Sequence, residues 1–448
     1  MPRFFYGFYC NFENHKRYFL RTSIYKFISN PKEFQAQLLH WTQSFREIVF
    51  LDSNSFSKEL SRYDVVVAVD AFTSLKTDYY NAFEDLKQYQ QTTKDWLFGY
   101  LSYDLKNDVE ELDSSNYDEL QFPDLYFFQP KKLFLLKGNQ LEIGYLNSCD
   151  DEVEVDFSDI QNGLRTQGSR VAAPLRIEQR ISKLDYITKV NEMLEHIHRG
   201  AIYEANFCIE FYAENACINP IEKFQELNEI SQAPFTVFFK NHRHYLLSAS
   251  PERYLKKEGE RIVSQPIKGT SKRFLNPIDD EKSKNQLAFD PKERAENIMI
   301  TDLVRNDLSR TAQKGSVQVD ELCGLYSFLQ VHQMISTISS KLDPQYSVID
   351  VLKTTFPMGS MTGAPKISAM KIIEDLEQTK RGLYSGAVGY FTPNDDFDFN
   401  VVIRSILYNE EKQYVSFSVG SAITALSNPE MEYEECLLKA KAMRDVLR

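Results

Sequence analysis

Residues 291–310 read PKERAENIMITDLVRNDLSR. Apolar side chains recur in this stretch at the spacing of one helix face, which predicts an amphipathic helix. The residues of that face are Ala295, Ile298, Met299 and Leu303. Glu293 and Glu296, three positions apart, then share a neighbouring face. Alone, such a pair is more often a solvated helix surface than a binding site.

The closing residues 428–448, NPEMEYEECLLKAKAMRDVLR, form a second helical pattern. Glu432 and Glu435 repeat the same spacing within it. Two carboxylate pairs could converge on one hard cation, because Mg²⁺ prefers carboxylate and water oxygens. Each pair by itself is again best explained as an ordinary charged surface, so a metal site needs independent support.

Residues 264–273, SQPIKGTSKR, predict a strand that ends at Pro266, followed by a tight loop with Lys268, Gly269 and Thr270. A lysine at a strand end can point into a pocket, where desolvation or nearby cations lower its pKa and make the amine a nucleophile. Most lysines in such loops are simply solvated, so the spacing alone is weak evidence.

Residues 356–376, FPMGSMTGAPKISAMKIIEDL, predict a glycine-rich loop that leads into a helix near Pro365. Free backbone N–H groups at such a helix start can bind an anion. The glycines do not have the spacing of a Walker A loop, and a carboxylate ligand fits better than a nucleotide. A capping turn without any ligand is an equally good interpretation.

Two single residues stand out in apolar surroundings. His332 lies in VHQMIST, where a histidine is more often a hydrogen-bonded core residue than a catalyst. Arg404 lies in VVIRSI, which reads as a strand. An arginine there needs a buried anionic partner or ligand, and we favour a ligand.

The rest of the chain predicts an α+β protein. Residues 182–200 form a helical pattern that begins at Ser182 and ends at Gly200, and helices alternate irregularly with strands after it. Before about residue 167, strand-like runs alternate with acidic loops. The small and polar residues 166–176 suggest a junction between two lobes.

Composition excludes several classes of protein. A net charge of -12 over 448 residues argues against nucleic-acid binding, although a bound cation can still attract a small anionic substrate. The six cysteines form no CxxC pair, so buried thiols in a reducing cytoplasm are expected. We expect neither a signal peptide in the first residues nor a membrane-spanning run.

Together, five motifs in this order resemble the chorismate-utilising family of anthranilate, aminodeoxychorismate, isochorismate and salicylate synthases. They are PIKGT, ERAENIMITDLVRNDL, GSMTGAPK, SGAVGY and the closing E-x-x-E-x-x-x-K-A. The resemblance covers Ser182 to Arg448. It implies one large α+β domain in which antiparallel sheets pack as a sandwich with helices outside. Residues 1–168 would be a strand-rich lobe of that fold, and residues 169–448 would form the catalytic region.

Three residues resemble the aminodeoxychorismate branch of this family: Lys268 where anthranilate synthases have alanine, Asn297 where they have histidine, and Glu252 in SPER. The branch implies conversion of chorismate and ammonia to 4-amino-4-deoxychorismate, for 4-aminobenzoate and folate synthesis. Lys268 would attack the ring while Glu252 gives a proton to the departing 4-hydroxyl, and ammonia would then displace the lysine.

The resemblance also implies a ligand set. Glu296 and Glu435 would hold Mg²⁺, with Glu293 and Glu432 supporting it through water. Arg404 and Tyr390 would hold the enolpyruvyl carboxylate, and His332 would lie beside the ring. The remaining residues expected to contact substrate are Gly269, Thr270, Thr362, Gly363, Lys366, Gly420, Ser421 and Ala422.

Two positions depart from the family pattern. Ammonia-using members have glutamine where this chain has Glu204, and water-using members have lysine there. Ala422 replaces a glycine whose backbone meets a carboxylate, and alanine fits if its φ is negative.

The chain contains no Gly-x-Cys-x-Gly segment of a glutamine amidotransferase, so the resemblance implies ammonia from a separate glutaminase. Two alternatives remain open: anthranilate synthase component I, whose tryptophan-binding LLES motif is absent, and a non-catalytic protein that keeps this fold.

Overall fold

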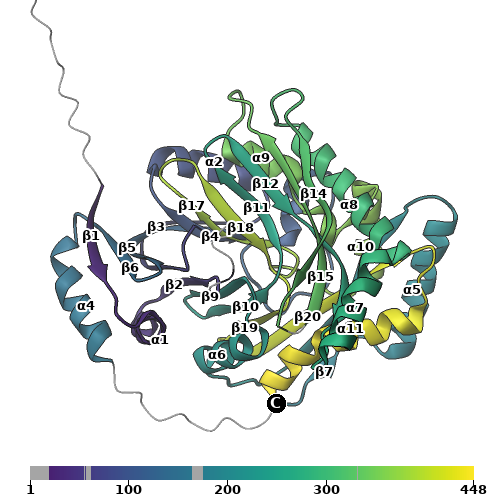
Figure 1. Cartoon of the computed structure of the whole chain (residues 1–448), viewed down its shortest axis with the longest axis horizontal. Helices are drawn as coiled ribbons and strands as arrows, with labels where there is room; N and C mark the ends of the chain where they lie inside the picture. The colour runs from purple at the N-terminus through teal and green to yellow at the C-terminus, as the bar shows by residue number, and fades with distance from the viewer. Residues whose placement is uncertain (1–19, 55, 57–61, 164–174, 330) are drawn as a thin grey trace, which may run out of the picture.

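The computed structural model describes residues 20–54, 56, 62–163, 175–329 and 331–448. All pairings between its named strands are antiparallel, and the strands form one connected sheet with helices outside it (Figure 1). The predicted α+β class with antiparallel sheets is therefore confirmed.

Two arms of the sheet begin at the long strand β5 (Leu125–Lys137). The first arm runs through β3 (Val65–Thr77), β2 (Glu47–Asp52), β9 (Phe235–Asn241), β10 (His244–Ser250), β19 (Ser405–Asn409), β20 (Tyr414–Thr424) and β8 (Glu204–Ala213). The second arm runs through β4 (Leu97–Leu101), β17 (Ala387–Phe391), β18 (Phe397–Val401), β11 (Arg253–Glu258), β12 (Arg261–Gln265) and β15 (Val331–Lys341).

Shorter strands extend this network. They are β6 (Gln140–Leu146) beside β5 and β1 (Arg21–Phe27) beside β6, β7 (Glu178–Gln179) and β16 (Gly363–Ala364) beside β8, and β13 (Ile267–Lys272) and β14 (Gln318–Ser327) beside β15. The two arms face each other across an apolar core. Phe239 of the first arm lies against Tyr100 of the second, with ring centroids 5.3 Å apart. Burial of such aromatic surface holds the two layers together as a sandwich.

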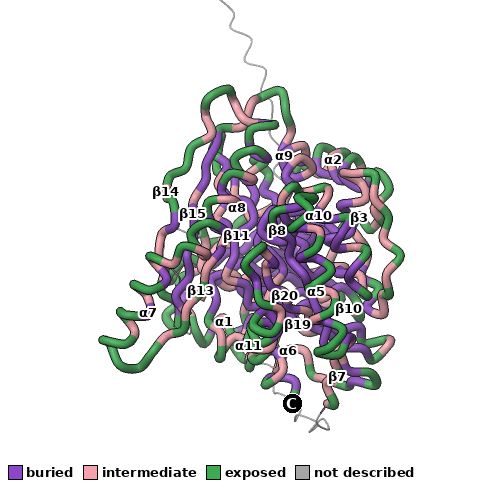
Figure 2. The backbone as a smooth tube through the Cα atoms, turned by 90° about the vertical axis from the view of Figure 1, so that its right-hand side faces the viewer, coloured by how far each residue is buried: buried purple, intermediate pink, exposed green. Residues whose placement is uncertain are grey.

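Helices cover the outer faces of the sheet (Figure 1). They are α1 (Pro31–Trp41), α2 (Ala82–Thr93), α3 (Lys106–Val109), α4 (Val153–Asn162), α5 (Lys183–His198), α6 (Pro220–Ser231), α7 (Pro277–Phe289), α8 (Pro291–Ser309), α9 (Val348–Thr355), α10 (Lys366–Leu376) and α11 (Pro429–Leu447). Short 3₁₀ turns occupy Thr42–Ser44, Tyr103–Leu105, Asp150–Glu152 and Gly359–Met361. Figure 2 shows β8 and β20 in the buried centre and α7 at the outer edge, where most of its residues are exposed.

The predicted helices are confirmed, and caps explain where three of them begin. Ser182 forms a capping box with Asp185 at the start of α5. Asp290 accepts hydrogen bonds from the first backbone N–H groups of α8, and Asn428 does so for α11. Such caps satisfy donors that a helix start would otherwise leave unpaired. In α8, however, the buried face is that of Glu296, Ile300 and Val304, whereas Ala295 and Ile298 of the predicted apolar face are exposed.

Two local predictions are wrong. Lys268 lies within strand β13, because the hydrogen-bonded ladder with β15 continues past Pro266 through an irregularity between Ile267 and Thr270. Arg404 lies in the bend between β18 and β19, where its φ of 54° is unusual for a residue with a side chain.

Strands from before and after the predicted junction share the sheet, because β2 pairs with β9 and β4 pairs with β17. The boundary at Gly168, like the first residues of the chain, lies outside the described part. Among the described cysteines, Cys149, Cys208, Cys217, Cys323 and Cys436 are free. No described helix has the length and apolar character needed to cross a membrane.

Candidate active site

The far ends of the two arms meet at a buried ion pair. The Nζ of Lys268, at the end of the second arm, lies 2.5 Å from Oε1 of Glu204, at the end of the first. Asn206 Oδ1 lies 3.5 Å from the same amine. The Lys268 side chain is 9% exposed and the Glu204 side chain 0%. The second carboxylate oxygen of Glu204 is buried and has no hydrogen-bond partner in the protein, which is unusual for a buried polar atom.

The protonation of Lys268 differs from the sequence-based expectation. Burial alone would lower the pKa of its amine, but the charges of Glu204 and Glu296 outweigh burial and raise the pKa above its usual range. The amine is therefore an ammonium group in this state, and it must lose a proton before it can act as a nucleophile.

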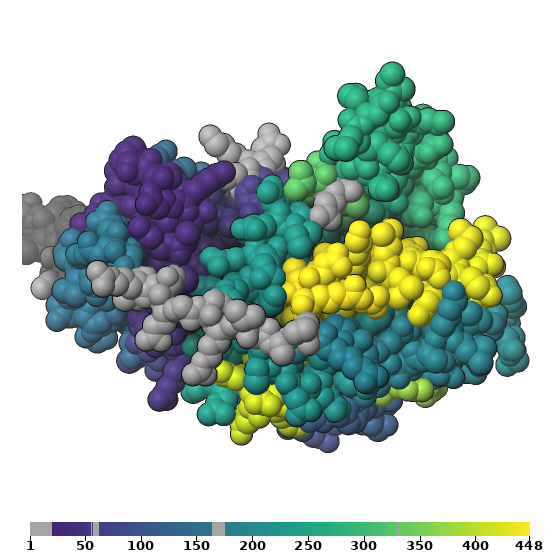
Figure 3. Space-filling view, turned by 90° about the horizontal axis from the view of Figure 1, so that it is seen from below, coloured from purple at the N-terminus to yellow at the C-terminus, as the bar shows by residue number. Residues whose placement is uncertain are grey.

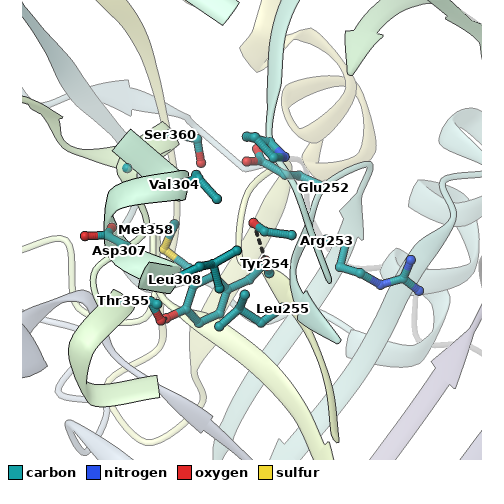
Figure 4. A pocket seen from close by; sticks show the side chains of 13 residues that line it. Glu252, Arg253, Tyr254, Leu255, Val304, Asp307, Leu308, Thr355, Met358 and Ser360 are labelled. Carbon is teal, nitrogen blue, oxygen red and sulfur yellow. Dashed lines mark hydrogen bonds between the residues drawn. The ribbon is translucent and has the colours of Figure 1, made fainter. Parts of the chain in front are cut away.

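Glu252, in the turn between β10 and β11, is the second titratable residue near Lys268. Burial raises the pKa of its carboxyl group to about 7, while a hydrogen bond with Ser360 and the charge of Lys268 oppose that rise. Glu252 lines a small cavity of about 20 Å³ that also contacts Asp307 and Thr355. Figure 4 shows Glu252 and Ser360 at one end of this cavity, with Arg253 pointing away from it. A carboxyl group with this pKa can donate a proton near neutral pH.

Gly269 allows Lys268 to lie close to α8. Its φ is 97°, and a Cβ atom there would lie 3.2 Å from the Met334 side chain and 3.3 Å from that of Glu293. Asn297 of α8 donates hydrogen bonds to the carbonyl oxygens of Lys268 and Met334. Glycine and asparagine thus fix the strand that carries the lysine against the helix that carries two of the predicted metal ligands.

Helices α8 and α11 bring the four predicted glutamates to one region. In Figure 3, α11 lies in yellow between the segment with α5 and the green segment around α7 and α8. Lys292 of α8 has its Nζ 3.3 Å from Oε1 of Glu432 and 3.9 Å from Oε1 of Glu296. Burial raises the pKa of Glu293, and it raises that of Glu296 to about 7.

The acidic region has the oxygen donors that Mg²⁺ prefers. Glu296 Oε1 is buried without a hydrogen-bond partner, which is the kind of atom that a cation would satisfy. Within the described ranges, however, no group of three or more His, Cys, Asp or Glu side chains is close enough to hold a metal ion. The kind of donors and the unpaired oxygen of Glu296 fit the ion, while the amine of Lys292 lies between the carboxylates of Glu296 and Glu432 in this state.

Glu435, the fourth predicted ligand, is held by another lysine. Lys439 donates to Glu435 Oε1 at 2.6 Å and to the carbonyl oxygen of Gly420 at 2.8 Å. Burial alone would raise the pKa of Glu435, but Lys439 outweighs burial and lowers it. Glu435 therefore stays more readily ionised than Glu293 and Glu296, whose pKa values are raised.

The glycine-rich loop packs directly on β8. A Cβ atom on Gly363 would lie 2.2 Å from the carbonyl oxygen of Glu204, so only glycine allows this approach. Asn206 donates to the carbonyl oxygen of Ser360 and takes part in the Lys268 contacts. Thr362 is fully buried, and its hydroxyl bonds within the loop. The loop therefore positions the strand that carries Glu204.

Lys366 follows this loop but is not free to meet a substrate. Its Nζ lies 2.7 Å from Asp307 Oδ2 and 3.1 Å from the carbonyl oxygen of Thr355. Both residues are largely buried, and burial lowers the pKa of Lys366 and raises that of Asp307. In this state the pair joins α10 to α8. Lys366 would have to leave Asp307 before it could make the expected contact with a substrate.

Tyr390, which was predicted to hold a carboxylate together with Arg404, packs against Trp96 and Phe98 of the second arm, with ring centroids 5.5 and 5.6 Å away. Arg404 donates to the carbonyl oxygen of Lys439, and burial lowers the pKa of its guanidinium group. A joint contact of Arg404 and Tyr390 with a substrate carboxylate stays a prediction.

The three predicted residues of β20 form part of its pairing with β8. Gly420 lies opposite Cys208, and an added Cβ would come within 2.6 Å of the Cys208 sulfur. The Ser421 hydroxyl lies 3.1 Å from that of Tyr186. Ala422 is not among the described residues with positive φ, so the side chain of alanine fits this position without backbone strain.

His332 is not brought to Lys268. Its ring nitrogens lie 2.8 Å from Ser327 Oγ and 3.1 Å from Asp280 Oδ1, so both already have partners. The neighbouring Gln333 lies opposite Thr270, and paired residues point to the same side of a sheet. Gln333 Oε1 is buried without a hydrogen-bond partner. Gln333, rather than His332, therefore shares the sheet face of Thr270.

The known proteins whose sequences resemble this chain belong to one family. The sequence pattern of chorismate binding enzymes matches residues 49–445. Aminodeoxychorismate synthase component 1 of Bacillus subtilis is 30% identical over 84% of this chain and 80% of its own length. Anthranilate synthase component 1 of Thermus thermophilus is 32% identical over 78% of this chain and 76% of its own. The chain spans 41% of the aminodeoxychorismate synthase of Arabidopsis thaliana, at 35% identity.

The fold has a solved counterpart. The crystal structure of anthranilate synthase component I from Streptococcus pneumoniae superposes with a TM-score of 0.74, over 87% of this chain and 93% of that one. The sequence identity is 23%, so this likeness concerns the fold alone.

Proposed function

Because the chain belongs to the chorismate binding enzyme family, we propose that it converts chorismate and ammonia to 4-amino-4-deoxychorismate. The observation that carries this proposal is the buried amine of Lys268, next to Glu204 and within electrostatic reach of Glu252 and Glu296. A buried lysine amine near a carboxylic acid supports covalent substitution on a ring once the amine has lost its proton.

The covalent step is balanced by the two side chains. The neutral amine of Lys268 forms a bond between its Nζ and a carbon of the ring while the bond between C4 and its hydroxyl oxygen breaks. Glu252 gives its proton to this oxygen, which leaves as water, and the resulting Glu252 carboxylate then takes the proton that the lysine amine loses. Ammonia next forms a bond to C4 while the bond between the ring and Nζ breaks, and a proton from the ammonia passes to the released lysine amine. Covalent catalysis divides one difficult displacement into two easier ones.

The acidic region supports substrate binding in the same proposal. Glu296 and Glu435 would hold Mg²⁺, with Glu293 and Glu432 supporting it, and the bound ion would neutralise the ring carboxylate of chorismate. Arg404 would hold the second carboxylate from the opposite side. Tyr390 would be its partner in this role.

We place ammonia supply in a separate glutamine amidotransferase, as the component 1 name of the Bacillus subtilis relative suggests. The product would still carry its enolpyruvyl group. A separate lyase would release pyruvate and form 4-aminobenzoate for folate synthesis in the cytoplasm.

The test is to incubate the purified chain with chorismate, MgCl₂ and ammonium chloride, and to identify the products by chromatography and mass. We expect aminodeoxychorismate from the natural chain and only background from Lys268→Ala. Lys272→Ala, in the same strand and exposed, is the matched control and keeps product formation.

Omission of ammonia isolates the first step. A mass increase on the intact protein that disappears in Lys268→Ala supports the lysine adduct. Anthranilate as the main product would replace the proposal with the tryptophan-pathway reaction, and unchanged chorismate under all conditions would contradict an autonomous enzyme.

A further inference from the structure

Lys292 lies where the two helices with the acidic residues face each other. Its Nζ is 3.3 Å from Glu432 Oε1 and 3.9 Å from Glu296 Oε1. Its hydrogen bonds and ion pairs within the described ranges are with these two carboxylates. The lysine therefore joins one glutamate of α8 to one of α11.

The carboxylates need this positive charge. The side chains of Glu296 and Glu432 are 9% and 4% exposed, and a buried carboxylate is costly without a counter-charge. At 3.9 Å the contact with Glu296 is too long for a hydrogen bond, and Glu296 Oε1 has no such partner. The ammonium group thus compensates the charge of Glu296 without satisfying its oxygen.

Lys439 provides a comparison within the same region. It also contacts a predicted metal ligand, Glu435, but it has a second acceptor in the carbonyl oxygen of Gly420. This backbone contact anchors Lys439 beside the ligand. Lys292 has no such anchor among its contacts, so its position depends on the carboxylates alone.

We propose that Lys292 is a displaceable cation, which neutralises Glu296 and Glu432 until Mg²⁺ binds to the acidic region and then turns toward solvent. The inference rests on the Mg²⁺ site of the proposed function. A lysine ammonium and a divalent cation cannot share one pair of carboxylates, because their charges repel each other.

The surroundings of Lys292 allow this movement. The side chain is 36% exposed, and it begins in the first turn of α8. Asp290 accepts hydrogen bonds from the backbone N–H groups of Lys292 and Glu293, so the helix start stays fixed while the flexible four-carbon stem turns. The displacement therefore requires a side-chain rotation and no change of the backbone.

The experiment measures Mg²⁺ binding to the full chain by titration calorimetry, without substrate. Lys292→Met removes the competing cation and keeps the apolar stem. We expect its Mg²⁺ dissociation constant to fall by about fivefold to tenfold, the effect of losing a partly exposed ion pair. We also expect a lower melting temperature without metal and a larger rise on addition of MgCl₂ than in the natural chain.

Two control variants separate this effect from a change in net charge. Lys183→Met removes one positive charge from an exposed pair with Glu434 of α11, and its Mg²⁺ affinity stays that of the natural chain. Lys292→Arg retains the competing charge, and its affinity stays below that of Lys292→Met.

The outcomes are distinct. Unchanged or weaker Mg²⁺ binding in Lys292→Met overturns the inference while leaving the metal site of the proposed function intact. Absence of Mg²⁺ binding in both proteins overturns the inference together with that metal site. Tighter binding in Lys292→Met supports the inference even where the product assay gives anthranilate, because calorimetry does not depend on the product.

Discussion

The proposed covalent step requires that Glu252 carries its proton and that Lys268 has lost one. The reactive form has a protonated Glu252, whose pKa is about 7, and a neutral Lys268, whose pKa is raised above 10.5. Below pH 7 the acid stays protonated, while the neutral amine increases about tenfold per pH unit. Above pH 7 the loss of the acid cancels this gain.

The rate of adduct formation should therefore rise up to about pH 7 and then stay level until the amine itself titrates. Glu252→Gln should lower the rate by roughly 100-fold to 10,000-fold and remove the break, so that the rate keeps rising through pH 7. Stopped-flow measurement of chorismate loss without ammonia checks both. A break near pH 7 that persists in Glu252→Gln would assign it to another residue.

Glu204→Gln tests the charge beside the nucleophile. The Glu204 carboxylate raises the pKa of Lys268, so its removal lowers that pKa. More neutral amine is then present between pH 7 and 10, and the level part of the profile rises about tenfold for each unit by which the pKa falls. Glu210→Gln, on the same strand and bonded to Arg180, is the control with an unchanged profile. A lower plateau in Glu204→Gln would show that the carboxylate is needed for the chemistry.

Residues that stand in motifs could be predicted from the sequence, whereas residues that act through contacts between distant segments could not. Lys268, Glu252 and the four glutamates were predicted because they stand in recognisable patterns. Lys292 was missed because its significance comes from its contact with Glu432, far away in the chain.

At the scale of elements, the Asp307–Lys366 pair joins α8 to α10. Breaking a buried pair from one side leaves an uncompensated charge, so Lys366→Met should lower the free energy of unfolding by about 3–5 kcal/mol. Lys26→Met, which breaks an exposed pair with Glu154, should change it by less than about 1 kcal/mol. Urea unfolding measures both.

The double variant Asp307→Leu with Lys366→Met tests the cause of that loss. It removes both charges, and burial has already shifted both pKa values toward the neutral forms. Most of the lost stability should therefore return. A double variant as unstable as Lys366→Met alone would mean that the lysine stabilises the loop through Thr355 instead.

Elements with clear periodicity and caps were predictable, whereas irregular ones were not. Helices α5, α8 and α11 have caps at Ser182, Asp290 and Asn428, so local sequence defines their starts. Strand β13 was predicted as a loop because proline and glycine usually interrupt strands. Its pairing with β15 tolerates both through a local irregularity, which depends on a partner about 65 residues away in the chain.

At the scale of the molecule, the sandwich brings together strands from both halves of the sequence. Residues before position 168 supply the root of both arms, and later residues supply their ends. Lys268 and Glu204 meet only because each arm reaches its full length. The class of fold could be predicted from motifs, but this closure could not, because it depends on pairings such as β2 with β9 and β4 with β17.

These pairings predict how the two halves behave when they are produced separately. Residues 175–448 alone would expose the paired edges of β9 and β17, together with core residues such as Phe391, which packs against Phe127 with centroids 5.6 Å apart. Unpaired strand edges and exposed apolar surface promote aggregation. We expect this fragment to aggregate or to bind hydrophobic dyes, as seen by size-exclusion chromatography and fluorescence.

Production of residues 1–163 together with residues 175–448 should restore one complex, because the cut removes only part of a connection and no described strand pairing. The complex should unfold in a single thermal transition and form the same chorismate product as the intact chain. A monomeric 175–448 fragment that unfolds cooperatively and is fully active would contradict this expectation. It would show that the ends of the two arms hold their geometry without the strands on which both depend here.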